Sequence, residues 1–141
     1  MEKYIRKQIL GAKAMADLGI NKVFHFYREV EITPELQQLI HPREEVKFAV
    51  KTIRDVAVFT DKRILIADKQ GITGKKAEYF SIPYKNIVTY AIETAGHFDL
   101  DAEIKLTLSG GMRVELRFFK DKRMNELLFK VYHTITEYLL A

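Results

Sequence analysis

The 141-residue chain contains no cysteine and no tryptophan, and only 3 prolines. Without cysteine it can have no disulfide framework, no thiolate metal site and no cysteine nucleophile. Nowhere do roughly 18 apolar residues follow one another, as a membrane-spanning helix would require. The N-terminus also lacks the uninterrupted apolar stretch of a signal peptide. These absences predict a soluble, cytoplasmic chain.

Charge of one sign is not in large excess either. The chain carries 23 lysine and arginine residues against 19 aspartate and glutamate residues, a net charge of +4. Such a mixed surface does not predict a nucleic-acid partner. The hydrophobic content of 48% is enough for one core, so the chain fits one domain with an accessory segment.

Residues 3–18 have the pattern of a short amphipathic helix, which Gly19 would end as a C-cap. Its basic side chains lie opposite an apolar stripe that consists of Ile5, Ile9, Ala12 and Ala16. The helix would either dock on its own domain or a neighbouring subunit, or lie on an anionic membrane. The small apolar residues and the lack of Phe or Trp anchors favour docking.

The next segment shows weaker patterns. Residues 23–32 alternate poorly and are rich in aromatics, which we interpret as a linker with partial helix. Thr33 followed by Pro34 is an N-cap with proline at the first helical position. This pair predicts a short helix from Pro34 to about Ile40.

From residue 46 the apolar period changes from about 3.6 to 2, which predicts strands. In the first of them Val46, Phe48 and Val50 are expected on one face. Near-minimal turns separate the early strands, which indicates an antiparallel meander. The expected strands lie near residues 46–50, 53–60, 63–68, 78–82, 87–94, 101–109 and 112–118.

The C-terminal residues 123–140 return to a helical period with one broad apolar stripe. The stripe predicts a helix that covers the open end of the strands and is essential to stability. Its apolar members are Met124, Leu127, Leu128, Val131, Tyr132, Ile135, Tyr138 and Leu139.

Seven antiparallel strands followed by one helix is the element order of a pleckstrin homology (PH) domain. The blocks FTDKR, DKQGITGKK, SIPY and AGHFDLDAE, in this order, resemble the bacterial PH family, formerly a domain of unknown function. The resemblance covers about residues 46–140. It implies a mainly β fold with α: a PH-like barrel of about seven antiparallel strands capped by a C-terminal amphipathic helix. It also implies frequent ring-like homo-oligomers, no known catalytic activity and no established ligand.

We therefore expect a helical N-terminal extension at 1–42 and a PH-like domain at 43–141. No nucleophile motif accompanies any serine, and no catalytic residues, metal site or cofactor are predicted. The loop with Gly71, Gly74, Lys75 and Lys76 lacks the spacing and hydroxyl of a phosphate loop. The alternation of His97, Asp99 and Asp101 is interpreted as turn chemistry rather than as metal ligation.

A cluster of basic residues is a candidate contact for an anion or an anionic lipid. Its members are Lys62, Arg63, Lys69, Lys75 and Lys76, with Lys85 as a further candidate. Eukaryotic PH domains place their inositol-lipid contacts in the first two strands and the loop between them, which here spans only about residues 51–54. Solvated surface lysines are therefore the favoured interpretation.

The sequence as a whole favours a non-enzymatic interaction module that self-assembles into a homo-oligomer. Exposed strand edges are templates for pairing with another chain. Surplus aromatics are expected to fill subunit contacts, and they comprise Phe24, Phe26, Tyr27, Tyr79, Phe80 and Phe98. The alternatives are an unidentified protein partner, and a peripheral module that binds anionic membranes or ligands through the basic loop. An enzyme or small-ligand carrier that uses residues 97–101 is the least favoured alternative.

Overall fold

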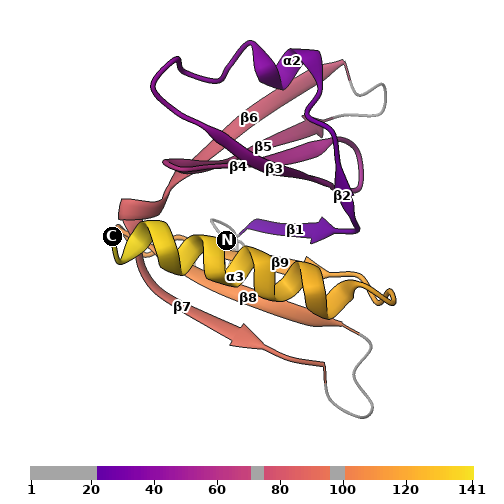
Figure 1. Cartoon of the computed structure of the whole chain (residues 1–141), viewed down its shortest axis with the longest axis vertical. Helices are drawn as coiled ribbons and strands as arrows, with labels where there is room; N and C mark the ends of the chain where they lie inside the picture. Colours follow the sequence, from indigo (N-terminus) through magenta and orange to yellow (C-terminus); the bar gives the residue numbers. More distant parts are fainter. Residues whose placement is uncertain (1–21, 71–74, 96–100) are drawn as a thin grey trace, which may run out of the picture.

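The computed structural model describes residues 22–70, 75–95 and 101–141. The predicted helix at 3–18, the loop glycines Gly71 and Gly74, and His97, Phe98 and Asp99 lie outside the described residues. Within those ranges the chain forms two β-sheets, with helix α3 (Met124–Leu139) lying beside them (Figure 1). No helix in these ranges is long and apolar enough to cross a membrane.

Strands β2 to β6 form one sheet, and strands β7 to β9 form the other, which β1 also joins. The four-stranded sheet has the order β1-β9-β8-β7, and its strands span Lys22–Phe26, Arg113–Phe118, Ala102–Leu108 and Ile87–Glu93. The five-stranded sheet has the order β2-β3-β4-β5-β6, and its strands span Glu29–Val30, Val46–Lys51, Val56–Thr60, Arg63–Gln70 and Lys76–Pro83. The antiparallel meanders β3 to β6 and β7 to β9 confirm the seven predicted strands. The exception is β1, which pairs in parallel with β9.

The prediction for residues 23–32 was wrong, because this segment contains β1 and β2 rather than a linker with partial helix. The described part of the expected helical extension is therefore largely extended. In β1 the buried Phe24 and Phe26 alternate with Val23 and His25, which is the period of a strand. The partner of β1 lies about ninety residues away, since Lys22 pairs with Val114. Local sequence carries no signal for such a distant pairing.

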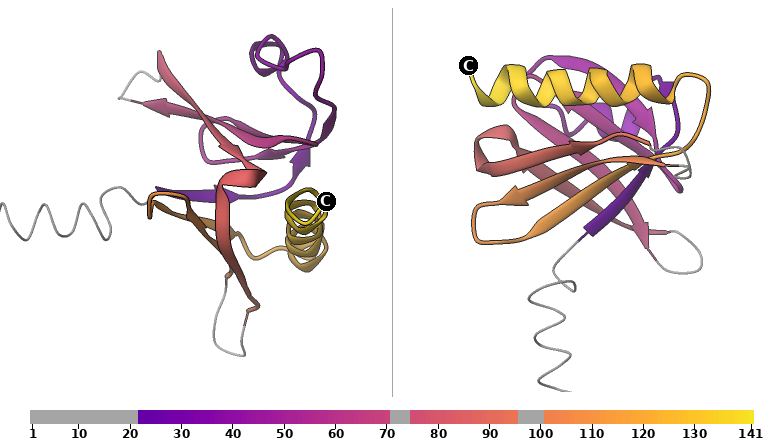
Figure 2. Two further views of the ribbon diagram at one scale, coloured as in Figure 1. Left: turned by 90° about the vertical axis from the view of Figure 1, so that its left-hand side faces the viewer. Right: turned by 90° about the horizontal axis from the view of Figure 1, so that it is seen from below.

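The predicted closed barrel is also not formed, because the hydrogen bonds define two open sheets. Strand β1 occupies the edge of β9, so this edge cannot pair with the five-stranded sheet. The sheets diverge from a junction at which β6 ends in Pro83 and the 3₁₀ turn η2 (Tyr84–Asn86) leads into β7 (Figure 2). Proline has no N–H to donate, which suits the end of a paired strand.

The main core lies between the two sheets and α3. Helix α3 confirms the predicted C-terminal helix, and it buries Met124, Leu127, Leu128, Val131 and Ile135. The core also contains Phe24 and Phe26, so these aromatics are not spare residues for subunit contacts. The ring of Phe26 packs edge-on against Phe59 and Phe118, with centroids 5.9 Å and 5.5 Å away.

A second, smaller core lies on the outer face of the five-stranded sheet, and we call it the outer core. Helix α2 (Pro34–Gln37) lies over this face and buries Leu36 against Ala49, Val58 and other small side chains. The Thr33 side chain accepts a hydrogen bond from the Leu36 N–H, as its N-cap role predicts, although the helix ends before the expected Ile40.

The register of β3 differs from the predicted alternation. The pairing of β3 with β4 shifts between Val46 and Phe48. As a result Val46 packs against the outer core, whereas Phe48 and Val50 face the main core. The expectation that Val46 shares a face with Phe48 was wrong, because the shift moves it to the other side of the sheet.

Candidate functional site

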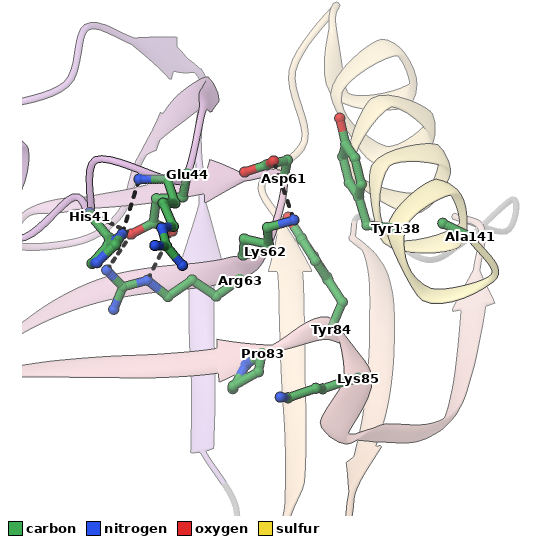
Figure 3. A pocket seen from close by; sticks show the side chains of 11 residues that line it. His41, Glu44, Asp61, Lys62, Arg63, Pro83, Tyr84, Lys85, Tyr138 and Ala141 are labelled. Atoms are coloured by element: carbon green, nitrogen blue, oxygen red, sulfur yellow. Dashed lines mark hydrogen bonds and ion pairs between the residues drawn. The ribbon is translucent and has the colours of Figure 1, made fainter.

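A cavity of about 540 Å³ opens at the sheet junction, and we call it the junction cavity. It lies between the loop before β3, the β4–β5 turn, the end of β6 with η2, and the C-terminal end of α3 (Figure 3). Charged side chains come from the first two of these elements and from η2. Pro83, Tyr84 and Tyr138 supply its apolar surface.

Arg63, one of the predicted anion contacts, is held in this cavity by Glu44. Arg63 Nη2 lies 2.6 Å from Glu44 Oε1, and its Nε donates to Glu44 Oε2 at 3.2 Å. The guanidinium also donates to the Leu39 carbonyl at 2.8 Å and to the Ser81 hydroxyl at 2.9 Å. Such bidentate pairs are strong and directional. Four of the five guanidinium N–H donors are thereby used.

Glu44 is the most buried charge of this network, with only 4% of its side chain exposed. Burial alone would raise its pKa, but hydrogen bonds from Arg63, the His41 N–H and Thr60, together with the charge of Arg63, lower the pKa to about 2. The carboxylate therefore stays ionised and paired. It fixes the loop before β3 to the start of β5.

Thr60 and Tyr84 complete the floor of the cavity. The buried Thr60 hydroxyl donates to Glu44 at 2.9 Å and accepts from the N–H groups of Lys62 and Arg63 at 3.0 Å each. The Tyr84 hydroxyl donates to the Thr60 carbonyl at 2.8 Å, and its ring stacks on Tyr138 at 5.6 Å. Burial, together with the fields of Tyr138, Asp61 and Glu44, raises the pKa of Tyr84, so the phenol remains a donor. The floor is thus rigid and fully hydrogen-bonded.

The structure does not gather the predicted basic residues in one place. Lys62 and Arg63 stand at the junction end of β5, whereas Lys69 lies near its other end, and Lys75 and Lys76 lie at the adjoining start of β6. Lys69 lies six positions after Arg63 along the strand, which corresponds to about 20 Å. Lys69 pairs with Asp55 at 3.5 Å. Lys85 does join Lys62 and Arg63 in the junction cavity.

Sequence reasoning missed Arg43 and Glu44. Both residues line the junction cavity, and both come from a loop that carried no recognisable motif. The decisive pairing of Glu44 with Arg63 spans nineteen positions. A charged loop after a proline is too common a pattern to reveal such a pairing.

The histidines do not form a metal or catalytic cluster in the part of the chain that the structure describes. No group of three His, Cys, Asp or Glu side chains is positioned there for a metal ion. His41 accepts a hydrogen bond from the Arg43 N–H within a turn, and His133 packs against Phe129 and Tyr132 on α3. Asp101 is exposed at the entry to β8.

Comparison with known proteins identifies relatives across most of the chain. The family model described as "Bacterial PH domain" matches residues 16–139. The uncharacterized protein YjqA of Bacillus subtilis is 47% identical over 98 residues, which cover 68% of this chain and 78% of YjqA. The uncharacterized protein YozO of the same organism is 34% identical over 93 residues, 66% of this chain and 80% of its own length.

Two solved structures agree in both sequence and fold. A DUF1696 family protein with a pleckstrin-homology domain from Shewanella loihica is 40% identical, with a TM-score of 0.66 over 79% of this chain and 96% of its own. A pleckstrin homology domain from Shewanella amazonensis is 44% identical, with a TM-score of 0.57 over 76% of this chain and 84% of its own. With its two sheets and C-terminal helix, the chain belongs to the bacterial PH domain family.

Proposed function

We propose that this protein is a non-enzymatic interaction module that assembles into a homo-oligomer through the free edge of β7. The observation that carries the proposal is the unprotected character of this edge. In the four-stranded sheet β7 is a terminal strand, and among the residues that the structure describes only β8 pairs with it. Its 7 residues contain neither lysine nor proline, the residues that usually block edge pairing.

The side chains of β7 also support this strand as the edge that self-assembles. Val88 is 60% exposed, although most valines in strands are buried. A register shift between Ile87 and Thr89 displaces Val88 from the ladder, and the pairing from Thr89 to Glu93 is regular. The register shift interrupts the edge at Val88, so an incoming strand would find regular backbone groups from Thr89 to Glu93, beside the exposed apolar side chain of Val88.

The corresponding edge of the five-stranded sheet is better protected. Strand β6 is terminal there, but it begins with Lys76, carries the exposed Glu78 and ends in Pro83. Charged side chains and proline are the usual means of preventing edge-to-edge association. Self-pairing of β7 around a twofold axis, or pairing of β7 with a different edge in a closed ring, would both bury Val88.

Light scattering on the full chain tests the proposal. We expect a stable multiple of the 16.4 kDa subunit at two protein concentrations. Val88→Lys should reduce the mass to that of one subunit, because a lysine at the edge opposes pairing. Ile53→Lys is the matched control, since Ile53 is also 60% exposed but lies in the β3–β4 turn, and its mass should stay that of the wild type. A monomeric wild type, or a Val88→Lys variant that stays fully assembled, would refute the proposal.

A further inference from the structure

The charges that line the junction cavity do not balance. Among the side chains of its lining, four are cationic, Arg43, Lys62, Arg63 and Lys85, and two are carboxylates, Glu44 and Asp61, a net side-chain charge of +2. A second cavity of about 390 Å³ near β2 and α3 has three cations and three carboxylates in its lining. A third, smaller cavity of about 140 Å³ has Arg54 and Lys69 against Asp68 in its lining, so the junction cavity combines the larger volume with the larger positive excess.

Both carboxylates of the junction cavity are already engaged. Glu44 accepts four hydrogen bonds, two of them from Arg63. Asp61 accepts the Glu45 N–H at 2.8 Å, and its other oxygen lies 3.7 Å from Lys62 Nζ. Within the described ranges, no hydrogen bond or ion pair engages the side chain of Arg43 or of Lys85. Two cations, together with the loosely held Lys62, therefore remain for a ligand.

The opposite wall of the cavity is apolar. Pro83 and the stacked rings of Tyr84 and Tyr138 form it, and the only polar atom of Tyr84 is already bonded to Thr60. Figure 3 shows Tyr138 on α3 on one side of the cavity and the cations Lys62 and Lys85 on the strand side. The cavity thus has one face for an anionic group and another for an apolar body.

Its size and rigidity suit a small molecule. A volume of about 540 Å³ lies within the roughly 300–1,000 Å³ that is usual for small-molecule sites. The Arg63–Glu44 pair and the Thr60 bonds hold the floor before any ligand arrives, which limits the ordering cost of binding.

From these features we infer that the junction cavity binds a small amphiphilic anion, an organic phosphate or carboxylate with an apolar or aromatic body. Arg43, Lys62 and Lys85 would contact the anionic group, while Pro83 and Tyr138 would contact the apolar part. A phosphate monoester, with its two negative charges, matches the net side-chain charge of the lining better than a carboxylate does. All contributing residues come from one copy of the chain, so the site does not depend on self-assembly.

Titration of the full chain followed by amide NMR tests this inference, with phenyl phosphate as the probe. We expect saturable shifts at Lys62, Lys85 and Tyr138. Benzoate should bind at least threefold more weakly because it carries one charge, and inorganic phosphate should also bind more weakly because it lacks the ring. Benzyl alcohol, which has the ring without a charge, should cause no saturable shifts.

Substitutions inside and outside the cavity test whether phenyl phosphate binds there. Arg43→Gln and Lys85→Gln should each weaken phenyl phosphate binding at least fivefold, and neither should alter the melting temperature, because both side chains are exposed. Lys120→Gln makes the same change of charge at an exposed position outside the cavity, and it should change affinity by less than twofold.

Three results would overturn the inference. The first is the absence of shifts around the cavity at millimolar phenyl phosphate. The second is an equal loss of affinity in Lys120→Gln and Lys85→Gln, which would mean that only the overall charge matters. The third is equal binding of inorganic phosphate and phenyl phosphate, which would remove the apolar contact.

Discussion

The two sheets differ in how many of their faces are covered. The five-stranded sheet has the main core on one face and the outer core on the other, so every residue of β4 is buried. The four-stranded sheet faces the main core with one side only. Its other side carries ion pairs such as Lys105 with Glu93 at 3.1 Å and Arg117 with Glu115 at 3.0 Å. A continuous apolar run therefore marks β4 in the first sheet, whereas alternation marks β8 and β9 in the second.

The largest expected effect lies where the two sheets face each other. Phe59 is fully buried in β4, stacked on Phe48 at 4.6 Å and in contact with Phe26. Phe59→Ala should reduce the free energy of unfolding by about 3–5 kcal/mol, because it leaves a large cavity in the core. Urea denaturation measures this loss. A loss below about 1 kcal/mol would mean that the sheets do not share one core.

The second prediction tests whether the outer core of the five-stranded sheet contributes to the free energy of unfolding. Leu36 of α2 is fully buried in the outer core. Leu36→Ala should cost about 2–4 kcal/mol in the same denaturation experiment. Leu39→Ala is the control, because Leu39 is 41% exposed, and it should cost less than about 0.5 kcal/mol. Equal small losses would show that only one face of this sheet stabilises the fold.

This two-sided burial explains what could be predicted from the sequence. The alternation of Ile104, Leu106 and Leu108 with polar residues correctly predicted a strand with one covered face. In β4, Val56 and Val58 also alternate, but the adjacent residues Ala57 and Phe59, which face the other way, are equally buried. The pattern predicted the strand, but it did not reveal that α2 packs on the outer face of this sheet.

The candidate site was less predictable for a related reason. The sequence singled out basic residues because charge runs are visible locally, and of these Lys62, Arg63 and Lys85 line the junction cavity, whereas Lys69, Lys75 and Lys76 lie elsewhere. The junction cavity instead depends on pairs that are distant in the chain, such as Glu44 with Arg63 and Tyr84 with Tyr138. Only the meeting of the two sheets and α3 brings these residues together.

The third prediction concerns the buried ion pair at the junction of the sheets. The pKa of Glu44 is lowered from 4.5 to about 2 in the folded protein, so its contribution to stability is complete above pH 4.5 and is lost as the pH falls towards 2. Glu44→Gln should cost about 2 kcal/mol at pH 7. The variant should also show a smaller loss of stability than the wild type between pH 4.5 and pH 2.5. Urea denaturation at a series of pH values measures both effects, and parallel pH profiles would contradict this role of Glu44.

The smallest expected effect comes from the matching pair on the exposed face of the four-stranded sheet. Glu115 and Arg117 are 3.0 Å apart, but 31% and 44% of their side chains are exposed, against 4% and 23% for Glu44 and Arg63. Water and salt screen the outer pair, so Glu115→Gln should change the free energy of unfolding by less than about 0.5 kcal/mol. Raising the salt concentration should shrink even this difference, whereas the effect of Glu44→Gln should persist. If both substitutions cost the same at high salt, burial at the sheet junction would not be what gives the Glu44–Arg63 pair its strength.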